Sequence, residues 1–279
     1  MHNVHPLGDF LETDPKGYLI SGVSPDNLIS PWREAVDYAT RLEVSRWGKQ
    51  LHSLYLRGSV ALGKAVLNRS DIDLFAVLFD EESATHQVLP WSEQELEDFY
   101  IRFPFLTSIE CSHISLAQVH GPFHYYRFVM KVSSLCIYGC DLLPTLDGYT
   151  TDAPIAEEWF RIFPHLVNRF ILEMKESGDY KRRKRLCMDM MKTFLRSGML
   201  LVMRRKSAYT RELYPSYQCF SDFYPEEESA MRRCLELAVN PISDQQTLLP
   251  FVFRLAEWMH GAAEAEFGSI ELLPVSLIS

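Results

Sequence analysis

Residues 54–78 read Leu-Tyr-Leu-Arg-Gly-Ser-Val-Ala-Leu-Gly-Lys-Ala-Val-Leu-Asn-Arg-Ser-Asp-Ile-Asp-Leu-Phe-Ala-Val-Leu, and this stretch decides the fold. An apolar strand runs into Gly58 and Ser59, and after eleven intervening residues a second apolar strand carries Asp71 and Asp73. Side chains alternate between the two faces of a strand, so both carboxylates point the same way, about 7 Å apart. Two carboxylates held side by side suit Mg²⁺, which prefers oxygen ligands and often bridges to phosphates.

The Gly-Ser pair between the strands has a chemistry of its own. Gly58 lets the backbone approach a ligand closely, because it has no Cβ atom. We expect Ser59 to cap a helix over 60–67, whose N-terminal N–H groups would suit a triphosphate. A phosphate cradle beside a metal site indicates phosphoryl or nucleotidyl transfer, in which positioning and charge neutralisation supply most of the catalysis.

This segment resembles the nucleotidyltransferase superfamily that includes DNA polymerase beta. The family signature is hydrophobic-Gly-(Gly/Ser), a spacer of about nine to thirteen residues, and Asp-hydrophobic-(Asp/Glu)-hydrophobic, which Gly58-Ser59 and Asp71-Ile72-Asp73-Leu74 fit. Arg57 departs from it, because the family often has an apolar or aromatic residue there; we expect Arg57 at the strand end, near phosphate. The resemblance implies that Asp71 and Asp73 hold Mg²⁺. The residues expected at the nucleotide are Gly58, Ser59, Arg57 and Ser70.

A third carboxylate on a neighbouring strand usually completes the site in this superfamily. A strand predicted over 105–114 carries Glu110 on the same face as Ser108 and Ser112, and a helix predicted over 92–102 precedes it. By resemblance to the aminoglycoside nucleotidyltransferases, Glu110 is the third metal ligand, the general base for the acceptor hydroxyl, or both. The alternative is a solvated strand carboxylate.

Composition sets the limits around this motif. The 279 residues are 47% hydrophobic and 13% aromatic, which is typical of a globular chain long enough for two domains. No uncharged run reaches the roughly 18 residues of a membrane span, and the N-terminus lacks the apolar segment of a signal peptide. The six cysteines show no paired Cys-x-x-Cys spacing and are expected to be free thiols. We therefore expect a cytoplasmic protein without membrane contact.

Periodicity along the chain predicts the architecture. Helical spacing begins at Ser30-Pro31 and continues to Trp47, a last strand covers 135–139, and 144–154 has the composition of a linker. Beyond the linker the period is helical throughout, and one apolar stripe is formed by Leu186, Met190, Phe194, Gly198 and Leu201. We expect an α/β (α+β) nucleotidyltransferase core with a mixed sheet over 1–150, followed by an all-α helical domain over 151–279.

Charge is distributed unevenly over the chain, whose net charge is −9. Residues 181–211 hold eleven Lys or Arg and one acid, Asp189, so this segment carries +10 and the remainder −19. A solvated helix face explains Lys181 to Arg185 poorly, because positive charge at a helix start opposes the helix dipole. A nearby anion, either nucleotide phosphate or RNA backbone, would relieve that cost.

Arg211 follows the basic helix. In aminoglycoside nucleotidyltransferases a helical C-terminal domain closes over the nucleotide, and a basic residue after a comparable helix reaches the phosphates. The resemblance implies this role for Arg211. The alternative is a capping or salt-bridge role.

The reaction implied by the resemblance is attack of an acceptor hydroxyl on the α-phosphate of ATP or another NTP, with release of pyrophosphate. A small hydroxylated acceptor, such as an aminoglycoside-like compound, is favoured by the expected architecture. A macromolecular acceptor, either tRNA or a partner protein such as a HEPN toxin, is the alternative that the basic segment supports. A third alternative is an inactive nucleotide-binding module.

Overall fold

The computed structural model describes residues 7–79 and 91–273, which form two compact units. The sheet unit is Ile20–Gly148, and the helical unit combines Met1–Leu19 with Tyr149–Ser279. Short 3-10 helices cover Pro25–Asn27, Gly48–Gln50, Leu143–Thr145 and Pro225–Glu227. No helix in the described part of the chain has an apolar stretch long enough to cross a bilayer.

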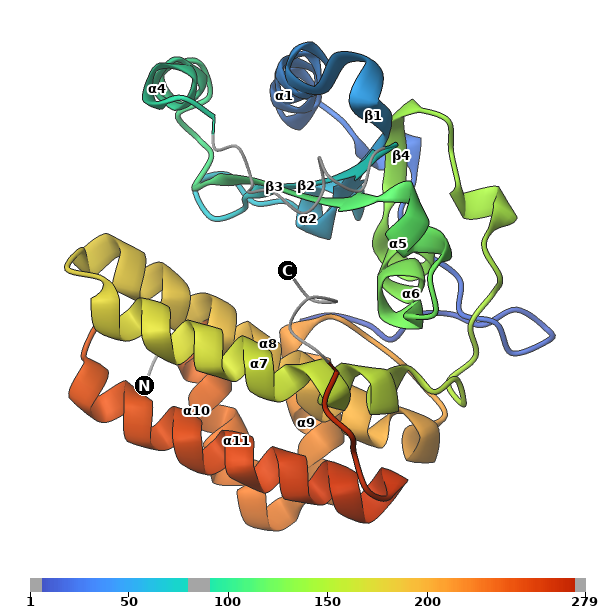
Figure 1. The fold of residues 1–279 in the computed structure, drawn as a ribbon. Helices are drawn as coiled ribbons and strands as arrows, with labels where there is room; N and C mark the ends of the chain where they lie inside the picture. Colours follow the sequence, from blue (N-terminus) through green and yellow to red (C-terminus); the bar gives the residue numbers. More distant parts are fainter. Residues whose placement is uncertain (1–6, 80–90, 274–279) are drawn as a thin grey trace. The chain divides into compact units, whose positions relative to one another are not determined.

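A four-stranded mixed sheet organises the sheet unit (Figure 1). Its strands are β1 (Leu51–Arg57), β2 (Ile72–Leu78), β3 (Ile109–Ser115) and β4 (Leu135–Gly139), in the order β3-β2-β1-β4. β1 pairs antiparallel with β2 and with β4, whereas β2 and β3 are parallel. Parallel neighbours need a long connection, and here it contains α4 (Glu93–Arg102). The expectation of a mixed sheet with helices is confirmed.

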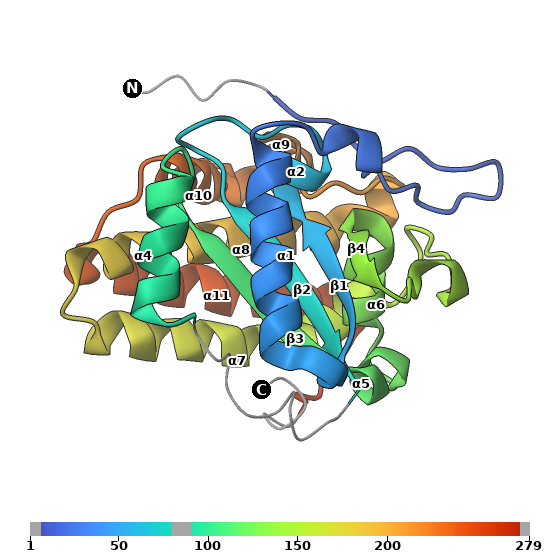
Figure 2. The same ribbon diagram turned by 90° about the horizontal axis from the view of Figure 1, so that it is seen from above.

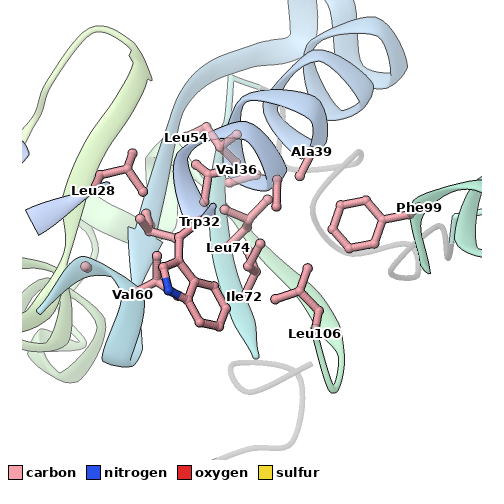
Figure 3. Close-up of a cluster of buried hydrophobic side chains, with 14 of the residues drawn as sticks. Leu28, Trp32, Val36, Ala39, Leu54, Val60, Ile72, Leu74, Phe99 and Leu106 are labelled. Atoms are coloured by element: carbon pink, nitrogen blue, oxygen red, sulfur yellow. The ribbon is translucent and has the colours of Figure 1, made fainter. Parts of the chain in front are cut away.

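One face of the sheet packs against α1 (Trp32–Trp47) and α4, and α1 crosses over the strands in Figure 2. Figure 3 shows the core between them, in which Ile72 and Leu74 of β2 meet Val36 of α1 and Phe99 of α4. Ile72, Leu74 and Phe99 are fully buried. Because side chains alternate along a strand, the burial of Ile72 and Leu74 directs Asp73 to the other face.

The other face packs against α5 (Leu116–His120) and α6 (His124–Ser133) through a smaller core that includes Tyr55, Phe75 and Val77. The Tyr55 hydroxyl accepts a hydrogen bond from the Leu142 N–H at 2.9 Å. Burial raises the pKa of Tyr55 to about 12. The side chain that precedes Phe75 on this face of β2 is Asp73.

Two local expectations are wrong in extent. The helix after β1, α2, covers only Gly58–Ala61 instead of 60–67; its N-cap position is Arg57, and no side chain caps it, so Ser59 is not the cap. Gly63 turns the chain with φ = +68° directly afterwards. β3 begins at Ile109 and not at 105. The apolar residues before it form a loop that packs against the core, where Phe105 makes an edge-on contact with Trp32.

The described part of the helical unit contains five longer helices (Figure 1). They are α7 (Ile155–Glu176), α8 (Tyr180–Lys206), α9 (Leu213–Phe223), α10 (Glu228–Val239) and α11 (Gln245–Phe267). α8 packs against α7, α9, α10 and α11. The predicted stripe on α8 is confirmed as core, because Met190, Phe194, Gly198 and Leu201 are buried and Leu186 is half-buried.

An N-terminal arm, residues 7–19, belongs to the helical unit. The Leu11 N–H donates to the Tyr209 carbonyl at 2.8 Å, and the Thr210 hydroxyl donates to the Asp9 carbonyl at 2.7 Å. The Leu19 N–H donates to the Tyr149 carbonyl at 2.8 Å. The sheet unit therefore begins at Ile20, because these bonds attach the preceding residues to the helices.

Candidate active site

The candidate carboxylates lie at one end of the sheet. Asp73 and Glu110 are paired in register across parallel strands β2 and β3. Asp71 directly precedes β2, where the pairing continues: the Ile72 N–H donates to the Ser108 carbonyl at 3.0 Å. Alternation along the chain places Asp71 on the same face as Asp73. The three carboxylates that the sequence indicates therefore share one face at the start of β2 and β3.

The Gly58-Ser59 turn lies at the same end, because β1 is antiparallel to β2 and its last residue, Arg57, pairs with Asp73. Gly58 has φ = +75°, a value that side chains disfavour, and a Cβ atom there would lie 3.8 Å from the Asp73 Cβ. The backbone turn after β1 is therefore in contact distance of Asp73. The topology brings the turn and the carboxylates together as predicted from the motif.

The Arg57 side chain, at the end of β1, is held over this face by residues of two other strands, β2 and β3. Its Nη2 atom lies 2.7 Å from Asp73 Oδ1 and 3.2 Å from the Ser112 Oγ atom. Its guanidinium also lies over the Phe75 ring, 4.9 Å from the centroid. The sequence placed Arg57 at the strand end and near phosphate. The structure confirms the strand end and shows the guanidinium bound to Asp73.

Ser70 closes the loop between α2 and β2. Its hydroxyl accepts a hydrogen bond from the Val66 N–H at 2.9 Å, while the Lys64 N–H donates to the Ser59 carbonyl at 2.9 Å. Both serines expected at the nucleotide thus lie in the segment that connects the Gly-Ser turn to the first aspartate. Their contact with nucleotide stays a prediction.

Mg²⁺ fits this site in donor chemistry. Carboxylate oxygens are its preferred ligands, and Asp71, Asp73 and Glu110 share a face. Within residues 7–79 and 91–273, however, no group of three His, Cys, Asp or Glu side chains converges on a point that could hold a metal ion. One carboxylate oxygen of Asp73, Oδ1, forms an ion pair with Arg57 at 2.7 Å. The guanidinium of Arg57 therefore neutralises part of the charge on the acidic face.

A buried carboxylate behind the sheet was missed by sequence reasoning. Glu43 of α1 is 1% exposed and accepts hydrogen bonds from the indole N–H groups of Trp47, at 2.9 Å, and Trp91, at 2.6 Å. Burial, and secondly Glu43, raise the pKa of Cys111 on β3 well above its usual range. The available signal was periodicity, because Glu43 occupies an apolar-stripe position between Ala39 and Trp47. Through Trp91, Glu43 joins α1 to the segment that precedes α4.

Arg211 belongs to the helical unit, where it follows α8 and is half-buried. Its carbonyl accepts a hydrogen bond from the Arg196 Nε atom at 3.4 Å. The structure therefore places Arg211 at the end of the loop that the N-terminal arm holds through Tyr209 and Thr210. Its contact with nucleotide stays a prediction.

The basic cluster Lys181 to Arg185 lies in the first turns of α8, as predicted. The Asp179 side chain caps this end by accepting from the Lys181 N–H at 2.9 Å. Arg182 forms an exposed ion pair with Glu173 at 3.4 Å, and Lys184 lies over the Tyr180 ring. The start of α8 carries the basic side chains of residues 181–185 and no acid in its first turn.

Comparison with known proteins found similarity among solved structures. No protein-family model and no curated protein sequence matches the chain. Among solved structures, it is similar to spectinomycin adenyltransferase AAD(9) from Enterococcus faecialis, determined with ATP and spectinomycin, at 14% sequence identity. The match covers 83% of this chain and 99% of that one, with a TM-score of 0.47. This TM-score is too low to carry weight, so the function is inferred from the residues of this chain.

Proposed function

We propose that the protein is a Mg²⁺-dependent nucleotidyltransferase that moves AMP from ATP to a hydroxyl group of a small acceptor, such as an aminoglycoside-like compound. One observation carries the proposal: a glycine turn and three carboxylates, on adjacent strands, meet at one end and on one face of the sheet. A turn that admits phosphates beside oxygen ligands is what in-line nucleotidyl transfer requires.

The residues have distinct roles in this proposal. Asp71 and Asp73 would hold Mg²⁺, which supplies neutralisation of the charge that develops on the phosphates. Glu110, one strand away from Asp73, would accept the proton of the attacking hydroxyl, hold the metal, or both. The backbone around Gly58 and the Ser59 hydroxyl would position the β- and γ-phosphates.

A tRNA or partner-protein acceptor is the second candidate. The observation that favours it is the basic start of α8, where Lys181, Arg182 and Arg185 are exposed and the first turn contains no acid. Such a surface attracts a phosphate backbone through charge alone. It would place the macromolecule on the helical unit.

The test is transfer of label from ATP to a cell extract that is then separated into small molecules, RNA and protein. Label in the α-phosphate should enter one fraction, and label in the γ-phosphate should enter none, because pyrophosphate leaves. Asp73→Asn serves as the inactive control. Incorporation of γ-label would show phosphoryl transfer instead, and equal incorporation by Asp73→Asn would remove the assignment of the site.

A further inference from the structure

We propose that Arg57 is a built-in counter-cation, which occupies Asp73 in the metal-free protein and moves to the nucleotide phosphates when Mg²⁺ binds. The proposal rests on the proposed function and adds to it a competition at the metal site. Its first support is the 2.7 Å distance between Arg57 Nη2 and Asp73 Oδ1, which is that of a charge-assisted hydrogen bond. The guanidinium charge beside this oxygen opposes the binding of a second cation there.

The pair is more constrained than an ordinary surface ion pair. The Arg57 side chain is 20% exposed and the Asp73 side chain 36%. Antiparallel pairing places the two residues side by side, and Ser112 and Phe75 hold the guanidinium from two further positions. Ordering a long side chain costs entropy, which usually cancels the gain of a surface ion pair. Here several contacts order the same side chain, so they share this cost.

The contacts of Arg57 leave part of its donor capacity unused. Its Nε atom is buried and has no hydrogen-bond partner among the described residues. Buried donors are rarely left without an acceptor, and each one costs free energy. The present arrangement of the guanidinium is therefore not its best-satisfied one. A planar group with five donors is suited to phosphate oxygens, which would satisfy more of them.

The direction of movement follows from the backbone. Arg57 directly precedes the Gly58-Ser59 turn, where the phosphates are expected, and it directly adjoins Asp73, where the metal is expected. A guanidinium at this position can exchange a carboxylate for a phosphate with a change of side-chain rotamer. Metal and nucleotide binding then assist each other: nucleotide removes Arg57 from Asp73, and metal releases Arg57 for nucleotide. Such coupling is reciprocal in binding free energy.

The test measures metal binding without turnover. Mn²⁺ affinity is determined by electron paramagnetic resonance for wild type, Arg57→Gln and the matched control Arg102→Gln. Arg102 also lies over an aromatic ring, that of Tyr38 at 5.3 Å, and has no carboxylate partner among its described contacts. We expect Arg57→Gln to bind Mn²⁺ about fivefold more tightly than wild type, by loss of a competing ion pair. Arg102→Gln should match wild type.

A non-hydrolysable ATP analogue supplies the second arm. With it, the Mn²⁺ affinity of wild type should rise and that of Arg57→Gln should rise less, while the analogue itself binds Arg57→Gln more weakly. Ser112→Ala, which removes one support and keeps the guanidinium, should show a smaller gain in metal affinity. This variant keeps the proposal testable if Arg57→Gln does not fold.

The outcomes separate the two proposals. Unchanged or weaker Mn²⁺ binding by both Arg57→Gln and Ser112→Ala, with binding still lost in Asp73→Asn, overturns the role of Arg57 and leaves the proposed function standing. Mn²⁺ binding that survives in Asp73→Asn, or no binding by any variant, overturns the proposed function together with it.

Discussion

Asp73 of β2 and Glu110 of β3 lie directly opposite each other across a parallel pair of strands. Directly paired residues on one face lie roughly 5 Å apart, and like charges at that distance destabilise the sheet. A cation between or beside the two carboxylates relieves this repulsion. Arg57, whose Nη2 atom lies 2.7 Å from Asp73 Oδ1, supplies one.

Asp71→Asn and Asp73→Asn should both abolish nucleotidyl transfer, but they should affect stability differently. Asp71→Asn relieves repulsion at the acidic face and should leave the melting temperature in EDTA unchanged or raised. Asp73→Asn also removes the partner of Arg57 and should lower the free energy of unfolding by at most about 1 kcal/mol, and the melting temperature with it. Turnover with Mg²⁺ and thermal unfolding check the pair. Near wild-type turnover in either variant would contradict the metal assignment.

Glu110→Gln should lower turnover by about 10²–10⁴-fold, because the amide keeps the shape of the side chain but cannot accept a proton. ATP binding should change less. Mn²⁺ affinity separates the remaining roles: it stays at the wild-type value if Glu110 is only the base, and falls if Glu110 is also a ligand. Wild-type kinetics in this variant would make Glu110 a bystander.

Neutralising Lys181 to Arg185 should have a mild effect on AMP transfer to a small acceptor, whereas Arg211→Ala should weaken use of ATP with any acceptor. The expectation follows from the role proposed for Arg211 at the phosphates. Steady-state kinetics and a tRNA filter-binding assay over a range of salt check both variants. Tight binding of tRNA that falls steeply with salt and disappears on neutralisation of 181–185 would favour the macromolecular acceptor instead.

Gly198→Ala should destabilise the helical unit. A Cβ atom there would lie 2.9 Å from the Phe220 ring, which Tyr224 and Trp258 hold in place. Overpacking costs about 1–3 kcal/mol, and alanine returns at most about 1 kcal/mol of helix propensity.

Gly261→Ala in α11 is the matched control, because a Cβ atom there meets nothing within 4 Å. It should stabilise the protein by about 0.5–1 kcal/mol. Urea unfolding measures both variants. Equal stability of the two would mean that Phe220 is free to move away.

Acid sensitivity should arise partly from the start of α4. The backbone N–H of Ser92, then its hydroxyl, hold the pKa of Glu95 below its ordinary value of 4.5. The stabilisation by the charged form is thus fully present above pH 4.5 and is lost as pH falls through the lower, folded-state pKa. Glu95→Gln should flatten the dependence of unfolding free energy on pH below 4.5. Parallel curves for variant and wild type would contradict this.

Local patterns predicted much of the fold. The helix at 92–102 was predictable because Ser92 and Glu95 form a capping box, and the structure contains both of its hydrogen bonds. The strands were predictable because alternation and apolar content mark a face that must be buried. The shared face of Asp71 and Asp73 follows from the same alternation.

Contacts between distant residues account for what the sequence did not predict. α2 ends early, and the Asn27 side chain donates to the Ala61 carbonyl at 3.0 Å from 34 residues away. The position of the Arg57 guanidinium depends on Asp73 and Ser112, on two other strands. The place of the N-terminal arm depends on hydrogen bonds to residues 149, 209 and 210, which are far away in the sequence.

The hydrogen bond between Leu19 and Tyr149 has a consequence for the order in which the two units can fold during synthesis. The sheet unit lies between these two residues in the sequence. All of it has therefore been synthesised when translation reaches Gly148. The hydrogen bond between Asp9 and Thr210 can form only later, because the two residues are 201 positions apart in the sequence. At about 5–20 residues per second this interval lasts about 10–40 s. The sheet unit can therefore fold on the ribosome before Tyr209, which accepts the hydrogen bond from Leu11, has been synthesised.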